Sequence, residues 1–192
     1  MQMSNRTKGL YISLIGVFIL SPDSLLIRLL NLNDISLIFY RGILPAIATS
    51  LFLLIYYKKD ILKAFILIGY AGLLNAFLYS IVHIAFAYSI QHTAVANTLI
   101  LIASAPIFTA ILSLIFLKEN PTPITWLTIF FALISIIIIG WGSYTSDGFI
   151  GDMFALITGI GMAAGAILVR YCKDKDLVPS VVIGCILTTL YC

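Results

Sequence analysis

Three polar side chains follow one another along an otherwise apolar stretch, at a spacing that places them on one side of a helix. They are Asn75, Tyr79 and His83, at positions i, i+4 and i+8. An amide, a phenol and an imidazole can bind a polar molecule, and an imidazole can also take part in proton coupling. This polar stripe predicts a substrate-binding surface. Packing of the same side chains against a neighbouring helix is the alternative.

A second polar set surrounds a proline in the next apolar stretch. Asn97 and Ser104 are seven residues apart, so they share one helix face, and Pro106 follows them. Proline lacks an N–H and frees a backbone carbonyl near Ile102, so we expect a kink. Because broken helices can line a transport cavity, Asn97 and Ser104 are further substrate-binding candidates. Close packing of the small residues around Ser104 is the alternative.

Two charged residues stand well inside apolar stretches. Asp23 lies seven residues before the end of the first stretch, and Arg41 lies six residues after the start of the second. At about 1.5 Å per residue, both are about 10 Å from the same membrane surface. Because an isolated charge is costly there, we predict an intramembrane ion pair between Asp23 and Arg41. The pair can be structural, or Arg41 can act in gating or bind a substrate carboxylate.

The composition of the chain argues against a water-soluble domain. Of the 192 residues, 61% are hydrophobic and 10% are charged, whereas soluble domains carry about 25% charged residues. A mean hydropathy of +1.12 and a formal charge of +3 also argue against nucleic-acid binding and disorder. The three cysteines form no Cys-x-x-Cys pair, so we expect neither a metal site nor a disulfide framework. The expected partner is the lipid bilayer.

Long uncharged runs predict an all-α polytopic membrane protein. A bilayer core about 30 Å thick needs about 20 apolar residues for each helical span. Six such spans are predicted, the first of them interrupted at residues 21–23, and a shorter seventh run follows. The spans cover residues 10–30, 35–57, 64–90, 94–117, 124–144 and 149–169, and the seventh run covers 177–192.

The basic residues lie on alternate connections between these spans. Nine of the 11 Lys and Arg residues lie at the N-terminus or on the second, fourth and sixth connections, and the other three connections carry none. Since basic residues near span ends stay in the cytoplasm, we expect a multi-pass protein of the cytoplasmic (inner) membrane with a cytoplasmic N-terminus. The nine are Arg6, Lys8, Lys58, Lys59, Lys63, Lys118, Arg170, Lys173 and Lys175.

The stretch from Ala94 to Tyr144 carries a distinctive order of features. A Ser-Ala-Pro at 104–106 lies inside one apolar run, a Leu-Lys-Glu-Asn-Pro turn at 117–121 ends it, and Trp126 and a β-branched helix follow. This order resembles the EamA-type transporters of the drug/metabolite transporter superfamily. The similarity extends more weakly to Phe-Tyr-Arg-Gly at 39–42 and to the glycine-rich last span.

The resemblance implies a fold of ten helices in two inverted five-helix repeats. Residues 8–144 would form the first repeat and residues 149–192 the beginning of the second. The seventh run has 16 residues, or about 24 Å, which is short of a span. We therefore expect about six or seven of the ten helices, in a chain that is a truncated product or a fragment.

The resemblance also implies a transporter that moves a small-molecule metabolite across the membrane by alternating access. The alternative is a non-transporting membrane protein, either an assembly subunit or an inert truncated product. HExxH, GxSxG and P-loop motifs are absent from the sequence, so we expect neither an enzyme nor a cofactor. Nothing in the sequence specifies the substrate, the coupling ion or the oligomeric state.

Overall fold

The computed structural model describes residues 5–20, 22–30, 32–143 and 148–192, and its regular elements there are helices. The chain divides into two compact units, Met1–Leu32 and Asn33–Cys192. Four helices among the described residues are long and apolar enough to cross a membrane: Asp34–Leu67, Gly69–His92, Val95–Leu117 and Phe149–Tyr171. Three shorter apolar helices lie at Gly9–Ile19, Pro123–Ile134 and Val178–Leu190.

The first unit contains two helices, α1 (Asn5–Leu20) and α2 (Asp23–Leu30). They replace the single span expected over residues 10–30, and the break lies at the predicted interruption. Pro22 precedes α2 and its carbonyl accepts the N–H of Leu26 at 2.9 Å. Asp23 lies in the first turn of α2, where a negative charge is favourable.

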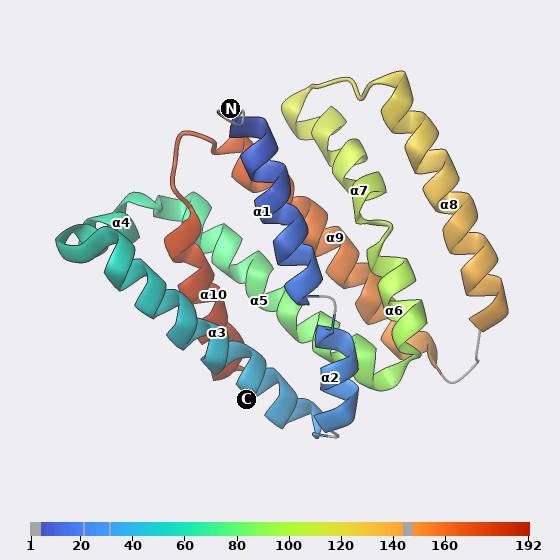
Figure 1. Cartoon of the computed structure of the whole chain (residues 1–192), viewed down its shortest axis with the longest axis horizontal. Helices are drawn as coiled ribbons and strands as arrows, with labels where there is room; N and C mark the ends of the chain where they lie inside the picture. Colours follow the sequence, from blue (N-terminus) through green and yellow to red (C-terminus); the bar gives the residue numbers. More distant parts are fainter. Residues whose placement is uncertain (1–4, 21, 31, 144–147) are drawn as a thin grey trace. The chain divides into compact units, whose positions relative to one another are not determined.

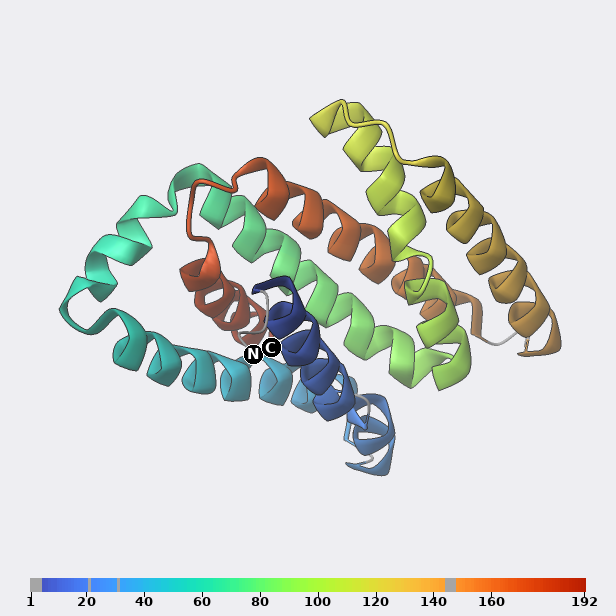
Figure 2. The same cartoon turned by 45° about the horizontal axis from the view of Figure 1, so that its top comes forward.

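The second unit is a bundle of helices that run alternately in opposite directions (Figure 1). Helix α9 packs along α5, and α10 packs against both α3 and α5. Figure 2 shows the same neighbours from a second direction. In chain order the helices are α3 (Asp34–Tyr57), α4 (Ile61–Leu67), α5 (Gly69–His92), α6 (Val95–Ile102), α7 (Ala105–Leu112), α8 (Pro123–Ser143), α9 (Phe149–Tyr171) and α10 (Val178–Leu190).

The expectation of one continuous span over residues 64–90 is wrong. A 3-10 turn η1 (Lys58–Asp60) and the short helix α4 follow α3, and α5 begins only at Gly69. Gly69 has a φ of 55°, a left-handed conformation that glycine adopts at no steric cost, and it separates α4 from α5. Uncharged residues continue through this corner, so hydropathy alone does not mark the break.

The kink expected near Pro106 is confirmed. Helix α6 ends at Ile102, α7 begins at Ala105, and a π-helical turn η2 (Ser113–Leu117) extends α7. The carbonyl of Leu101 accepts both the backbone N–H of Ser104 at 3.1 Å and its hydroxyl at 2.5 Å. Local hydrogen bonds thus replace part of the helical ladder that the proline interrupts.

The interior of the second unit is built from small and polar side chains. Its buried residues include many alanines, serines and threonines, whereas large apolar side chains such as Ile55 and Tyr70 are exposed. Gly161 lies against Val82 of α5, and Gly184 lies against the carbonyl of Ala76, so their helices approach closely. Small residues at helix contacts and large apolar residues outside are typical of proteins that fold in lipid. The protein is an all-α polytopic membrane protein.

Candidate functional site

A cavity of about 620 Å³ lies between α7, the turn that precedes α8, and α9. Its volume is in the range of small-molecule sites, about 300–1,000 Å³. Most of its wall is apolar and small, with a few hydroxyl groups and a pair of opposite charges. The lining residues are Ala105, Pro106, Thr109, Ala110, Ser113, Glu119, Asn120, Pro121, Thr122, Thr125, Met162, Ala163, Ala166 and Arg170.

An ion pair stands at the exposed side of this cavity. Nη2 of Arg170, in the last turn of α9, lies 2.7 Å from Oε2 of Glu119 in the turn before α8. The two side chains are 60% and 49% exposed, so water screens the pair and it contributes little to stability. It places one cation and one anion where a molecule would enter the cavity.

The proline break positions one wall of the cavity. Pro106, Thr109 and Ser113 stand at i, i+3 and i+7, so they share one face of α7 and its π-helical extension. The hydroxyl of Thr109 donates to the carbonyl of Ala105 at 2.9 Å, and its oxygen can still accept a hydrogen bond from a ligand. The opposite wall comes from α9, where Ala166 lies one turn before Arg170.

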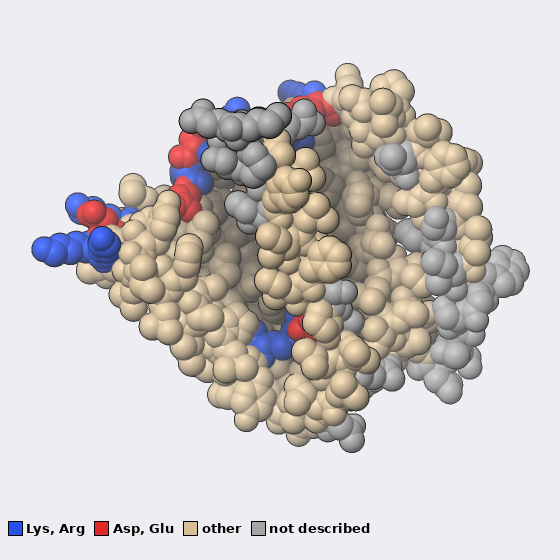
Figure 3. All heavy atoms as spheres, in the orientation of Figure 1, with Lys and Arg blue, Asp and Glu red and all other residues tan. Residues whose placement is uncertain are grey.

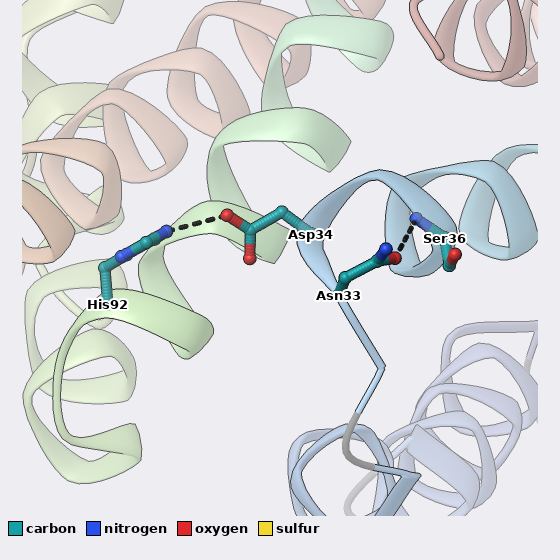
Figure 4. Close-up of polar contacts among 4 residues, drawn as sticks. All are labelled: Asn33, Asp34, Ser36 and His92. Atoms are coloured by element: carbon teal, nitrogen blue, oxygen red, sulfur yellow. Dashed lines mark hydrogen bonds and ion pairs between the residues drawn. The ribbon is translucent and has the colours of Figure 1, made fainter.

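The other end of the bundle is held by polar contacts between helices. We call it the His92 end, and the end that carries the cavity mouth the Glu119 end. Nε2 of His92 lies 2.8 Å from Oδ2 of Asp34 and links α5 to α3, as Figure 4 shows. The hydroxyls of Ser89 and Thr98 lie 2.8 Å apart and link α5 to α6, and Thr93 Oγ1 donates to Asp152 Oδ1 of α9 at 2.8 Å.

Backbone packing is also close at the His92 end. A Cβ atom built on Gly151 would lie 2.7 Å from the backbone N of Thr93 and from the backbone C of His92. Only a residue without a side chain lets α9 approach the end of α5 in this way. The contacts of α5 with α3, α6 and α9 at the His92 end are therefore tied by side chains, and α9 packs closely against the end of α5. A second cavity, of about 580 Å³, lies in the same half of the bundle between α5, α9 and α10, and its lining is apolar apart from Ser80 and Tyr191.

The polar stripe on α5 contacts α10 in this structure. Asn75 Nδ2 donates to Ser180 Oγ at 2.8 Å, and both side chains are buried. The rings of Tyr79 and His83 stack with their centroids 4.2 Å apart, and Gly184 of α10 lies against Tyr79. None of the three stripe residues lines the 620 Å³ cavity. Their role in substrate binding stays a prediction.

The two polar candidates on α6 and beside the proline break are buried. Asn97 is 7% exposed, and Ser104 is 8% exposed and donates its hydroxyl to the Leu101 carbonyl. A Cβ on Gly159 would lie 3.7 Å from Ser104 Oγ, so this side chain faces α9. The cavity includes Pro106 but neither of these two residues. The five predicted substrate-binding residues thus do not line this cavity, and their function stays a prediction.

Arg41 packs against an aromatic ring within the second unit. Its guanidinium carbon lies 4.6 Å from the ring centroid of Phe86 on α5, a cation–π contact. Asp23 belongs to the first unit. The ion pair between Asp23 and Arg41 stays a prediction.

Most residues that line the cavity are not among those that the sequence predicts to bind substrate. The sequence predicts only a capping or solvent-facing role for Glu119 and only packing for Thr109. A signal is present in the helical spacing of Pro106, Thr109 and Ser113, which puts two hydroxyls on the face of the kink. The pairing of Glu119 with Arg170 joins residues far apart in sequence and leaves no local signal.

Comparison with models of protein families gives a match. Residues 7–141 match the family model of the EamA-like transporter family, and this range covers more than half of the chain. No curated protein and no solved structure matches the chain. The chain therefore belongs to the EamA-like transporter family, and it is a multi-pass membrane protein of the drug/metabolite transporter type.

Proposed function

We propose that the protein moves a small metabolite across the cytoplasmic membrane by alternating access. The observation that carries this proposal is the difference between the two ends of the bundle. The cavity of about 620 Å³ at the Glu119 end carries hydroxyl and charged groups, whereas the cavity of about 580 Å³ in the other half has an almost wholly apolar lining and interhelical polar contacts hold the His92 end. This arrangement is expected of a carrier in a state in which its site is open to one side of the membrane.

The distribution of basic residues supports an orientation for this state. Among described residues of the second unit, lysines follow α3 and α7 and precede α10, all at the Glu119 end. Figure 3 shows Lys and Arg atoms gathered along the edge formed by the α3–α4 corner and the α9–α10 connection. With basic residues retained in the cytoplasm, the cavity would open inward, and the N-terminus would also be cytoplasmic.

The chemistry of the cavity suggests the kind of molecule that it takes. Small apolar side chains form most of the wall, Thr109 and Ser113 offer hydroxyl groups, and Glu119 and Arg170 offer both charges. Such a wall suits a small molecule with an apolar body and polar ends. The stripe of Asn75, Tyr79 and His83 would join the site only in a state in which α10 moves away from α5.

The proposal is tested by filling the cavity without disturbing the fold. Ala166 is exposed within the cavity, so tryptophan there occupies the space without overpacking the core. Val169, on the same helix, is 49% exposed and does not line the cavity, which makes Val169→Trp the matched control. The assay compares uptake of metabolites from a cell extract, measured by mass spectrometry, into inverted membrane vesicles with and without the protein.

Vesicles with the wild-type chain and with Val169→Trp should accumulate at least one metabolite more than empty vesicles do. Ala166→Trp should lose at least about nine-tenths of this uptake at equal folded amount, because its ring fills the site. Equal uptake by Ala166→Trp and Val169→Trp would show that substrate does not pass through this cavity. Uptake no greater than that of empty vesicles would favour the non-transporting alternative.

A further inference from the structure

The corner between α3 and α5 combines clustered lysines with exposed apolar side chains. Helix α3 ends at Tyr57. The next residue, Lys58, has a φ of 47° and turns the chain into the 3-10 turn η1 and helix α4. We call residues 58–67 the lysine corner. Figure 3 shows its basic atoms projecting at the edge of the molecule.

The apolar part of the lysine corner is open to its surroundings. None of the residues of η1 or α4 is buried, and Leu62, Ile66 and Leu67 are 74%, 77% and 73% exposed. Helix α4 has seven residues, or about 10 Å, which is too short to cross a bilayer. A short helix with such exposed side chains, between two helices long enough to span, suits the boundary between acyl chains and headgroups.

The charged part of the corner has more cations than its own acid can neutralise. Residues 58–67 contain three lysines and a single carboxylate, that of Asp60. Nζ of Lys63 pairs with Oδ1 of Asp60 at 2.9 Å, which engages this carboxylate. The charges of Lys58 and Lys59 therefore remain in excess within the corner.

An acid of the neighbouring connection, Asp176, lies at the end of α3. Asp176 accepts the hydroxyl of Tyr57 with one carboxylate oxygen and the N–H of Val178, at 3.0 Å, with the other. A Cβ on Gly69 would lie 3.7 Å from Nζ of Lys175, so the same connection brings a further cation to the corner. The charges of Lys175 and Asp176 offset each other, so the excess charges of Lys58 and Lys59 are not cancelled by this connection.

We propose that the lysine corner binds an anionic phospholipid headgroup. The Nζ atoms of Lys58 and Lys59 contact the phosphate, while Leu62 and Ile66 enter the acyl region beside it. A free phosphate ion would use the lysines but not the apolar residues, so the combination favours a lipid. This surface is separate from the transport cavity and does not depend on the proposed function.

The test reports lipid binding at the corner itself. Tyr70 is 92% exposed directly after the corner, so a Tyr70→Trp reporter is placed in a chain that carries Trp126→Phe and Trp141→Phe. The full chain is reconstituted in phosphatidylcholine bilayers that contain increasing fractions of brominated phosphatidylglycerol or brominated phosphatidylcholine. Quenching of the reporter's indole fluorescence then gives the relative affinity of the two headgroups.

We expect the reporter chain to prefer phosphatidylglycerol by at least about five-fold, since each lysine near the surface attracts anionic lipid. Lys58→Gln/Lys59→Gln should reduce the preference to below about two-fold. Lys118→Gln/Lys173→Gln removes the same charge from other connections and should leave the preference unchanged. Size-exclusion profiles of all variants establish that they are folded.

Two results would overturn the proposal. One is a preference near one in the reporter chain, or an equal preference in the two double variants. The other is loss of the preference in sodium phosphate but not in sodium chloride of the same ionic strength, because this would identify a site for free phosphate.

Discussion

The two ends of the second unit use similar polar residues in different ways. At the His92 end, Asp34 of α3 contacts His92 of α5, and Asp152 of α9 accepts the hydroxyl of Thr93, the residue after α5. Two neighbouring helices are therefore tied to α5. At the Glu119 end, the acid and the base that meet are half exposed and border a cavity. Polar groups between packed helices hold a bundle together, whereas polar groups on a cavity wall leave room for a ligand.

The proline break lies where α9 passes from α6 to the cavity beside α7. A Cβ atom placed on Gly159 would lie 3.4 Å from the carbonyl oxygen of Leu101, so α9 contacts the chain just before the proline break. Beyond it, α7 and α9 enclose the cavity, with Pro106 in its wall. The same helix α9 thus contacts α6 closely and borders an open space against α7.

The largest of the effects is expected at the close contact between α9 and the end of α5. Gly151→Ala places a methyl group against the backbone at the end of α5 and should destabilise the protein by about 1–3 kcal/mol. Gly165 on the same helix has only an ordinary contact, 3.9 Å from Asn75 Oδ1, so Gly165→Ala should be neutral or slightly stabilising. Thermal unfolding in detergent measures both. Similar melting temperatures for the two variants would contradict the close packing of α9 against the end of α5.

The next effect comes from the buried hydroxyl pair between α5 and α6. Ser89 and Thr98 are both 0% exposed, so Ser89→Ala leaves the Thr98 hydroxyl without this partner and should cost about 1–2 kcal/mol. Adding Thr98→Val removes the remaining polar group and should cost less than the sum of the single losses. Thermal unfolding of the three variants gives the coupling. Strictly additive losses would mean that the hydroxyls do not meet.

The smallest effects concern the two ion pairs. Asp34→Asn and Glu119→Gln each weaken an exposed pair and should lower stability by less than about 1 kcal/mol. The difference between them should appear in transport. Glu119→Gln changes the cavity mouth, so the concentration of metabolite that half-saturates uptake should rise at least about three-fold. Asp34→Asn in the same uptake assay should leave that concentration unchanged, and the reverse pattern would place the binding site at the His92 end.

The helices of this protein follow largely from its sequence, and the site follows only in part. Apolar runs and basic connections predict α3, α8 and α9 within a few residues, because lipid imposes length and charge rules. Gly69 interrupts a run without charged residues, so hydropathy does not show that the helix breaks there. For Asn75 the sequence predicts an inward polar face, but its partner Ser180 depends on how α10 packs, which local spacing does not encode.

Thiol labelling tests most directly whether the cavity opens at the Glu119 end. In a chain without Cys172, Cys185 and Cys192, Ala166→Cys puts an exposed thiol in the cavity wall, and Ser180→Cys puts one in the contact of α10 with α5. A membrane-impermeant maleimide is applied to inverted vesicles and to intact cells whose outer surface it reaches. The cavity thiol should react in inverted vesicles but not in intact cells, and the contact thiol should react in neither. Reaction of the cavity thiol only in intact cells, or equal protection of both thiols, would contradict an inward-open cavity.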